Sequence, residues 1–241
     1  GLILDRIVQS KREEIAQARA GCDLEKMRAK AETADPPRDF FGAVTRPGAV
    51  RLIAELKKAS PSKGVIREDF DPVEIAQSYV EGGASCLSVL TDKPFFQGSL
   101  EIFRQVRGTV DLPMLRKDFM IDEWQFYEAR AAGADAVLLI TSILSDRELE
   151  RFHTLSGELG MAALVETHSA EDIRRAVAAC RPRLLGINNR DLHDANFKTT
   201  LDHTEQMLPV LNECLAKSEK GPALVSESGI YRAEDVERLK N

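Results

Sequence analysis

Short apolar runs recur from residue 51 onward, and each is followed by a stretch in which apolar residues return every three or four positions. Continuous apolar runs are typical of parallel strands buried on both faces, and the longer spacing is typical of amphipathic helices. This alternation predicts a parallel sheet with helical crossovers. The predicted strands are Arg51–Lys57, Ser85–Thr91, Leu112–Lys117, Ala136–Ile140, Met161–Glu166, Leu184–Asn188 and Ala223–Ser228.

The predicted helices between these strands carry recognisable terminal residues. One begins at Pro72 directly after Asp71, which gives an N-cap followed by proline at the first helical position. Ser169 is a further N-cap candidate, and Gly133 and Gly160 suit the C-terminal ends of helices. The other predicted helices are Ser99–Arg107, Asp122–Ala132, Ser145–Leu159, Ser169–Ala179, Leu201–Lys217 and Tyr231–Asn241.

Fifty residues precede the first predicted strand. Leu2–Ala20 has the pattern of an amphipathic helix, in which the charged stretch Lys11–Glu14 interrupts the apolar positions. A second helix, Leu24–Ala34, follows the N-cap candidate Asp23 and ends before Pro36-Pro37. The segment is too short for a core of its own, so we expect a helical cap on the following domain.

Polar and ionisable residues stand where the predicted strands end, among them Glu55, Lys117, Glu166 and Asn188. Charges gathered at the C-terminal ends of parallel strands are the arrangement of a (β/α)8-barrel active site. We therefore predict an α/β protein with one barrel domain over residues 1–241, in which 1–50 form the helical extension and 51–241 form units one to seven. The eighth βα unit is missing from the sequence, and we expect the intact polypeptide to continue beyond Asn241.

Composition narrows the function classes. The 241 residues are 43% hydrophobic and 30% charged, which is ordinary for a globular domain. The net charge of −6 argues against a nucleic-acid partner, and no apolar run is long enough to span a membrane. The four cysteines are scattered, which fits reduced thiols in the cytoplasm. The histidines lack metal-ligand spacing and no glycine-rich nucleotide loop is present, so the sequence suggests neither a metal site nor a dinucleotide or nucleotide site.

The acids and lysines at the strand ends suggest proton transfer. Glu55 and Lys57 are two positions apart, so they lie on one face of a strand, where they could form a catalytic pair or only a structural ion pair. Lys117 and Glu166 at equivalent strand ends favour the catalytic interpretation. Such groups would perturb one another's pKa values, as acid–base catalysis requires.

Further candidates would bind and orient a substrate. Ser60 lies in the loop Lys58–Gly64, which suits a phosphate-contacting loop or an ordinary flexible one. Ser226–Gly229 is a better anion candidate, because barrels often bind phosphate after strands seven and eight. Asn188 could orient a hydroxyl or carbonyl group, and Arg190 could hold an anion or pair with Asp191.

Aromatic residues at two strand ends suggest an apolar part of the same site. Phe95, Phe96 and Phe119 follow the second and third predicted strands. They could line an aromatic pocket, or they could belong to the ordinary core.

Several segments together resemble the indole-3-glycerol phosphate synthase family. The likeness runs from about Leu4 to Asn241 and departs from the family at the end, where the eighth strand with its Gly-and-Ser phosphate loop is absent. The segments that carry the resemblance are Ile53–Gly64, Ser88–Asp92, Phe95–Ser99, Leu115–Phe119, Leu164–Thr167, Gly186–Leu192 and Ser226–Ile230.

This resemblance implies a lyase of tryptophan biosynthesis that closes the ring of 1-(2-carboxyphenylamino)-1-deoxyribulose 5-phosphate with loss of CO2 and water. It implies no cofactor, a phosphorylated small-molecule substrate, and a cytoplasmic monomer able to associate with other enzymes of the pathway. The catalytic residues would be Lys117 as proton donor, Glu166 as base or stabiliser of the cationic intermediate, Lys57 with Glu55 at the substrate carboxylate, and Asn188 and Ser228 as orienting groups. The substrate-binding residues would be Ser60 and Gly229 at the phosphate, Phe96 and Phe119 at the anthranilate ring, and Arg190 and Glu227.

Two other functions fit parts of the pattern. Another phosphate-binding barrel enzyme, such as a phosphosugar isomerase, would need no pocket for an aryl carboxylate, and the lysines and phenylalanines argue against it. A non-catalytic barrel module would be expected to have lost an ionisable strand end. All of these strand ends are present.

Overall fold

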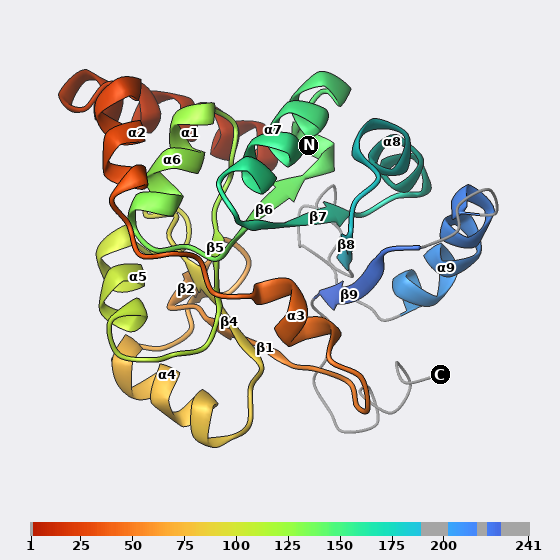
Figure 1. The fold of residues 1–241 in the computed structure, drawn as a ribbon, viewed down its shortest axis with the longest axis horizontal. Coiled ribbons are helices and arrows are strands. Elements are labelled where there is room, and N and C mark those ends of the chain that lie inside the picture. Colours follow the sequence, from red (N-terminus) through yellow and green to blue (C-terminus); the bar gives the residue numbers. More distant parts are fainter. Residues whose placement is uncertain (1, 189–201, 216–220, 228–241) are drawn as a thin grey trace. The chain divides into compact units, whose positions relative to one another are not determined.

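The computed structural model describes residues 2–188, 202–215 and 221–227. Seven strands form one sheet in the order β1-β4-β5-β6-β7-β8-β9, and helices alternate with them along the chain (Figure 1). The strands are β1 (Ile53–Leu56), β4 (Cys86–Leu90), β5 (Met114–Lys117), β6 (Ala136–Ile140), β7 (Ala162–Thr167), β8 (Leu184–Asn188) and β9 (Ala223–Glu227). Strands joined by helical crossovers in sequential order confirm the predicted (β/α)8-barrel fold class.

Several candidate residues lie at the C-terminal ends of neighbouring parallel strands, and the register of the strand pairs places these ends side by side. Lys117 of β5 is opposite Leu90 of β4, and Asn188 of β8 is opposite Glu227 of β9. All seven predicted strands are present, and β6 and β8 have the predicted bounds.

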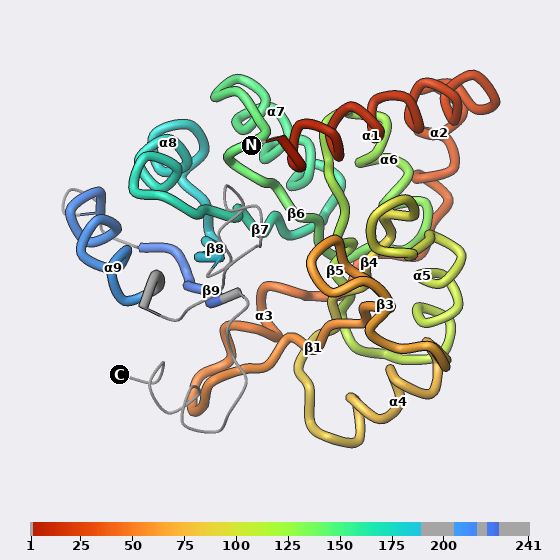
Figure 2. The backbone as a smooth tube through the Cα atoms, turned by 180° about the vertical axis from the view of Figure 1, so that it is seen from behind, coloured from red at the N-terminus to blue at the C-terminus, as the bar shows by residue number. Residues whose placement is uncertain are grey.

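The chain divides into two compact units, of which the larger comprises residues 7–138 and 155–162. Strands β1, β4 and β5 of this unit are flanked by α4 (Pro72–Glu81), α5 (Leu100–Arg107) and α6 (Glu123–Ala131) (Figures 1 and 2). Its fully buried side chains include Leu87, Phe103, Met114 and Phe126. Asp71, Ser99 and Asp122 cap these helices, and the proline at the start of α4 is at the predicted position.

The second unit comprises residues 1–6 and 139–154 and the described part of 163–241. It contains β7, β8 and β9 with the short helix η1 (Thr141–Ile143) and helices α8 (Ala170–Cys180) and α9 (Asp202–Leu215), whereas α7 (Asp146–Glu158) begins in it and ends in the other unit. Val165, Ile173 and Leu185 are fully buried here. Ser169 and Asp172 form a reciprocal capping box at the start of α8, as the serine there predicted.

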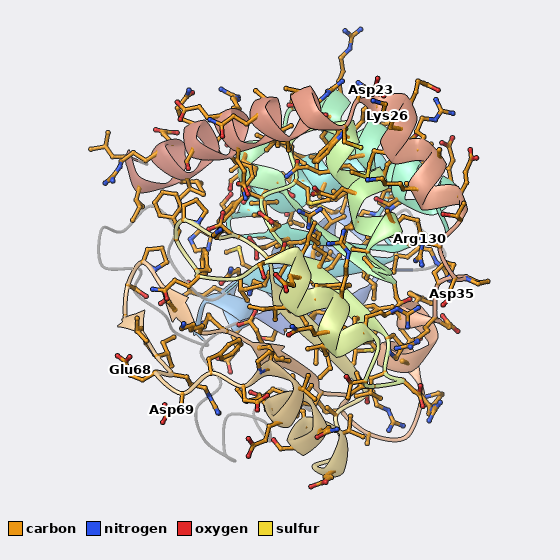
Figure 3. The ribbon with its side chains drawn as sticks, turned by 90° about the vertical axis from the view of Figure 1, so that its left-hand side faces the viewer. Asp23, Lys26, Asp35, Glu68, Asp69 and Arg130 are labelled. Carbon is orange, nitrogen blue, oxygen red and sulfur yellow. The ribbon has the colours of Figure 1, made fainter. Side chains whose placement is uncertain are left out.

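Two helices make up most of the N-terminal segment, α1 (Leu2–Gly21) and α2 (Leu24–Glu32). The Asp23 carboxylate accepts a hydrogen bond from the Lys26 backbone N–H at 2.9 Å, which confirms the predicted N-cap (Figure 3). Ile15, Met27 and Trp124 pack into a common apolar cluster, which fixes these helices on α6. Where α2 leads toward the barrel, Arg130 of α6 donates to the Asp35 carbonyl at 2.7 Å (Figure 3).

Four short elements were not predicted. Helix α3 (Phe40–Thr45) inserts Phe40, which is 1% exposed, into the core ahead of β1. Strands β2 (Ala59–Ser60) and β3 (Gly64–Val65) form an antiparallel hairpin inside the segment predicted as a loop, and Gly64 takes a φ of +64° there. η1 is the fourth. Each is too short to produce a periodic pattern in the sequence.

No helix in the described ranges is both long and apolar enough to cross a membrane. The helix predicted for Tyr231–Asn241 lies outside the described residues.

Gly98 lies where the loop after β4 returns to the strand, and its N–H donates to the Asp92 carbonyl at 2.8 Å. A Cβ atom at this position would lie 2.1 Å from the Leu90 carbonyl oxygen. We expect Gly98→Ala to lower the free energy of unfolding by about 1–3 kcal/mol, because the backbone must move to relieve the clash. Urea unfolding with Gly157→Ala as the matched control checks this.

A Cβ atom at Gly157, inside α7, would meet nothing within 4 Å. The control should therefore stabilise the protein by about 0.5–1 kcal/mol through helix propensity. Equal effects of the two substitutions would show that the loop accommodates a methyl group at Gly98.

Candidate active site

Three ionisable side chains meet at the ends of β1 and β5 in the larger unit. The Lys117 ammonium group lies 2.5 Å from Oε1 of Glu55, and the Lys57 ammonium group lies 3.7 Å from Oε2 of the same carboxylate. The side chains of Glu55, Lys117 and Lys57 are 28%, 27% and 22% exposed, so the cluster is half-buried and still open to a ligand. The structure thus brings together three of the predicted catalytic residues, with one carboxylate between two cations.

The second unit holds the other predicted acid. Glu166 near the end of β7 is 5% exposed, and its Oε1 accepts a hydrogen bond from the Asn188 amide nitrogen at 3.0 Å. The Asn188 carbonyl lies 3.0 Å from Nδ1 of His168. Asn188 therefore holds the carboxylate of Glu166 in one orientation, which a base that receives a proton from a fixed direction requires.

An aromatic pair lies in the larger unit near Lys117. The rings of Phe96 and Phe119 are 6.0 Å apart between centroids and inclined at 40°. Both side chains are half-buried. This tilted geometry is a favourable arrangement of aromatic rings, and the exposed part of the pair offers an apolar surface for a further ring. Phe95, by contrast, contributes its backbone N–H to Asp92.

Ser60 lies in β2 of the unexpected hairpin and is 3% exposed. Its hydroxyl accepts a hydrogen bond from the Lys63 backbone N–H at 3.3 Å and lies 3.4 Å from the Ser62 hydroxyl. The Ser60 hydroxyl is therefore engaged within the hairpin, and it keeps its own hydrogen as a donor.

Arg190, Ser228 and Gly229 lie outside the described residues, and only the backbone of Glu227 is described, at the end of β9. In the part of the chain that is described, no three His, Cys, Asp or Glu side chains are grouped as metal ligands.

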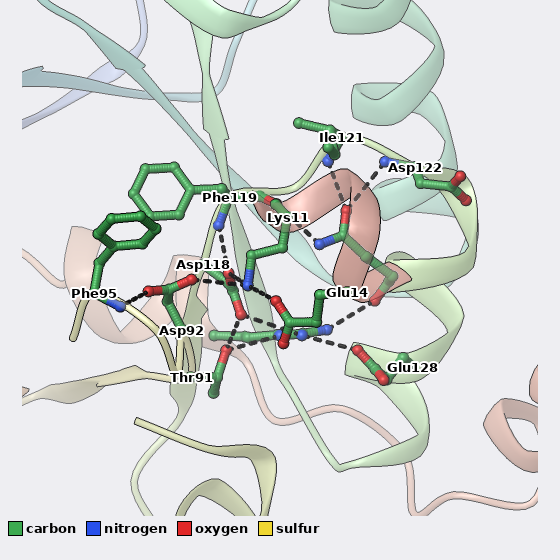
Figure 4. Close-up of polar contacts among 12 residues, drawn as sticks. Lys11, Glu14, Thr91, Asp92, Phe95, Asp118, Phe119, Ile121, Asp122 and Glu128 are labelled. Atoms are coloured by element: carbon green, nitrogen blue, oxygen red, sulfur yellow. Dashed lines mark hydrogen bonds and ion pairs between the residues drawn. The ribbon is translucent and has the colours of Figure 1, made fainter. Parts of the chain in front are cut away.

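A buried ionic network beside Lys117 was not predicted. Lys11 of α1 is 2% exposed, and its ammonium group lies 2.9 Å from a carboxylate oxygen of Asp92 and 2.9 Å from one of Asp118 (Figure 4). Glu14 adds a third carboxylate oxygen at 2.6 Å. The charge of Lys11 therefore lies among the apolar residues of the buried face of α1, and the sequence analysis had assigned it no partner. Lys11 follows Ile7 and precedes Ile15 by four positions each, and this spacing places it on the buried face.

Arg116 completes the network from the neighbouring position of β5. Its guanidinium group lies 3.3 Å from Asp118 and 2.8 Å from Glu128 of α6, and its Nε donates to the Thr91 hydroxyl at 3.0 Å. Thr91 in turn donates to Asp118 at 2.7 Å. Burial by itself would raise the pKa of Asp118, but the charges of Arg116 and Lys11 outweigh burial and hold that pKa below its ordinary value.

We expect Asp118→Asn to lower the free energy of unfolding by about 3–5 kcal/mol at neutral pH, because it leaves buried cations without their partner. The folded-state pKa of Asp118 is depressed. The stabilisation is therefore present above its ordinary pKa of about 3.9 and is lost as the pH falls through the folded value. The difference in the free energy of unfolding between the wild type and Asp118→Asn should therefore become smaller below about pH 4.

Urea unfolding at a series of pH values from neutral to acidic measures this. Asp146→Asn is the control, because the Asp146 side chain is 69% exposed in its pair with Arg175. Its effect should stay small throughout. If the loss in the free energy of unfolding caused by Asp118→Asn did not change with pH, this would contradict the assignment of Asp118 as an ionised carboxylate in the folded protein.

Comparisons with known proteins agree on one family. The model of indole-3-glycerol phosphate synthase matches residues 4–241. Proteins named indole-3-glycerol phosphate synthase from Roseiflexus castenholzii and Laribacter hongkongensis are 49% and 47% identical, and each alignment covers 99% of this chain and 88% of the relative. A third, from Rippkaea orientalis, is 49% identical over 98% of this chain and 79% of its own length.

Among solved structures, a mandelate oxidase variant has a TM-score of 0.50 at 15% identity, covering 73% of this chain and 60% of that one. This likeness concerns the fold alone. The family model spans almost the whole chain, and the relatives share about half of its residues. The chain therefore belongs to the indole-3-glycerol phosphate synthase family.

Proposed function

We propose that the protein converts 1-(2-carboxyphenylamino)-1-deoxyribulose 5-phosphate into indole-3-glycerol phosphate, CO2 and water, in the biosynthesis of tryptophan. Family membership over residues 4–241 supports the activity. The single structural observation that carries the assignment to residues is the Lys117–Glu55–Lys57 cluster at the ends of β1 and β5. The reaction needs a proton donor at a carbonyl oxygen, and an ammonium group held by a carboxylate meets that need.

In the first step, the ring carbon that bears the carboxylate attacks the ribulose carbonyl carbon, and the carbonyl oxygen gains a proton. Lys117 is the donor in our proposal. Glu55 fixes the ammonium group through its 2.5 Å contact, and Lys57, at 3.7 Å from the other oxygen, is placed to hold the substrate carboxylate. Loss of CO2 then returns the bonding electron pair to the ring and restores its aromaticity.

In the later step, the new hydroxyl group leaves as water, and a proton must be lost from the adjacent carbon. We assign Glu166 as the base or as the group that stabilises the cationic intermediate. Asn188 supports this role by donating to Oε1 of Glu166 at 3.0 Å, which orients the carboxylate. Lys57 with Glu55 would assist the departure of the hydroxyl group by protonating it.

The remaining assignments concern binding. Phe96 and Phe119 would pack on the anthranilate ring through the half-buried pair. Ser60 and Gly229 would contact the phosphate, with Ser228, Arg190 and Glu227 in supporting roles. The Ser60 hydroxyl can accept from the Lys63 N–H and at the same time donate its own hydrogen to a phosphate oxygen.

We also propose that the protein acts in the cytoplasm as a monomer. In the described ranges, the large apolar side chains that are exposed on helices are Leu2 of α1 and Val80 of α4, so they form no continuous apolar helix face. All four cysteines are free, and burial raises the pKa of the Cys86 thiol to about 12. Unpaired thiols fit a reducing compartment.

The decisive experiment is to incubate the purified protein with the anilino-ribulose phosphate and follow the appearance of indole fluorescence, with CO2 release measured in parallel. Equal amounts of indole product and CO2 are the expected result. A phosphosugar isomerase would consume a phosphosugar without forming indole, and a non-catalytic module would leave the substrate unchanged. Either outcome would contradict the proposed function.

A further inference from the structure

Lys11 joins two strand ends that carry different parts of the proposed site. Asp92 follows β4, and its Oδ2 accepts the Phe95 backbone N–H at 3.0 Å. Its carbonyl accepts from Gly98 at 2.8 Å. Asp92 therefore shapes the loop that presents Phe96. Figure 4 shows the Asp92 carboxylate and the Lys11 ammonium group facing each other.

Asp118 shapes the other strand end. It directly follows Lys117 in sequence, and its Oδ1 accepts the Phe119 backbone N–H at 2.7 Å. The same oxygen lies 2.9 Å from the Lys11 ammonium group. The position of this carboxylate thus affects Lys117 on one side and the ring of Phe119 on the other.

The charges make Lys11 a strong link between these ends. The Lys11, Asp92 and Asp118 side chains are 3%, 1% and 1% exposed, so water screens the contacts little. Burial by itself would lower the pKa of Lys11, but Asp118 and Asp92 outweigh burial and raise that pKa above its ordinary value. The ammonium group therefore remains charged throughout the pH range in which enzymes work.

We propose that Lys11 is a positioning residue, whose ammonium group fixes the ends of β4 and β5 relative to each other and so sets the places of Phe96, Phe119 and Lys117. It does not touch the reacting atoms. The inference rests on the proposed function for what these three side chains do. It adds a catalytic purpose to a lysine of the N-terminal extension.

The test uses a charge-balanced variant. Lys11→Met alone leaves two buried carboxylates with one cation fewer, and it could fail to fold for that reason. Lys11→Met combined with Asp92→Asn removes one positive and one negative charge, and the pair of Arg116 and Asp118 remains. The asparagine still offers an oxygen to the Phe95 N–H.

Arg19→Met is the matched control, because it also removes a basic side chain of α1 that pairs with an acid following β5. Arg19 lies 2.9 Å from Asp122, and its side chain is 38% exposed. It touches neither Asp92 nor Asp118 in the contacts of the described chain. This control should keep kcat and KM within about threefold of wild type.

The double variant should lose about 10–100-fold in kcat/KM, measured well below its unfolding temperature. A displacement of about 1 Å in a positioning contact can cost about that much. KM should rise because the aromatic pair shifts, and kcat should fall because Lys117 shifts. A purely structural role for Lys11 would lower the unfolding temperature without moving either constant of the folded protein. Constants within about threefold of wild type would overturn the proposal.

Amide hydrogen exchange gives a readout that does not need activity. The N–H groups of Phe95 and Phe119, which donate to Asp92 and Asp118, should exchange at least about tenfold faster in the double variant and at the wild-type rate in Arg19→Met. If the wild-type protein forms no indole, the proposed function fails. The amide exchange rates then test by themselves whether Lys11 holds the ends of β4 and β5 in place. Faster exchange supports the role of Lys11 in holding the strand ends, and unchanged exchange overturns it.

Discussion

Replacement of Lys117 by alanine is expected to lower the turnover of the indole-forming reaction by about 10²–10⁴-fold, the usual contribution of a positioned general acid. The fold should survive, because the side chain is 27% exposed and lies at the end of its strand. Glu55 would keep Lys57 as a partner at 3.7 Å. Turnover, thermal unfolding and CO2 release of the purified variant measure these effects.

Two further variants separate the possible roles of Lys117. Lys117→Arg keeps the positive charge beside Glu55 but hardly releases a proton, so it should be nearly as inactive as the alanine variant if proton donation is the role. Lys30→Ala, an exposed change on α2, is the control and should leave turnover unchanged. Turnover of Lys117→Ala within about threefold of wild type would contradict the assignment of Lys117 as the proton donor. A threefold change in rate corresponds to less than about 1 kcal/mol of activation free energy.

Glu166→Gln is expected to reduce kcat by about 10²-fold or more while changing KM little. Glutamine keeps the shape of the side chain and an Oε1 atom that can accept the hydrogen bond from Asn188. It cannot take up a proton or carry negative charge beside a cationic intermediate. Steady-state kinetics with the anilino-ribulose phosphate measure both constants.

The matched control is Glu171→Gln in the first turn of α8, where the side chain is exposed. It removes the same charge five residues further along the chain and should leave kcat unaltered. A raised KM with unchanged kcat in Glu166→Gln would instead identify Glu166 as a residue that only binds substrate.

Much of the barrel could be predicted because local pattern and tertiary structure agree there. The continuous apolar runs at β6 and β8 predicted the first and last residues of both strands. The pair Asp71-Pro72 predicted where α4 begins. The β2–β3 hairpin could not be predicted, because strands of two residues have no period and their pairing depends on the turn at residues 61–63 between them. The single-domain prediction for residues 1–241 remains a prediction.

The candidate site was partly predictable, because the rule that parallel strands end at one edge of a sheet brings Glu55, Lys57 and Lys117 together. The same rule selects Glu166 and Asn188 without showing that they are hydrogen-bonded. The network of Lys11 could not be foreseen, because its partners Asp92 and Asp118 lie 81 and 107 positions away in sequence. A lysine is rarely buried, so only its four-residue spacing from Ile7 and Ile15 indicated where it lies.

The alternation along β5 has a consequence for how this chain tolerates insertions and deletions. Arg116 contacts α6, whereas Lys117 beside it contacts Glu55 of β1, so neighbouring residues serve opposite faces of the sheet. A one-residue insertion before Arg116 would place its guanidinium group at the position of Lys117, and a one-residue deletion there would place the amine of Lys117 in the buried network. Changes in length are thus more damaging here than most substitutions, and they should be tolerated only in the loops that flank the strand.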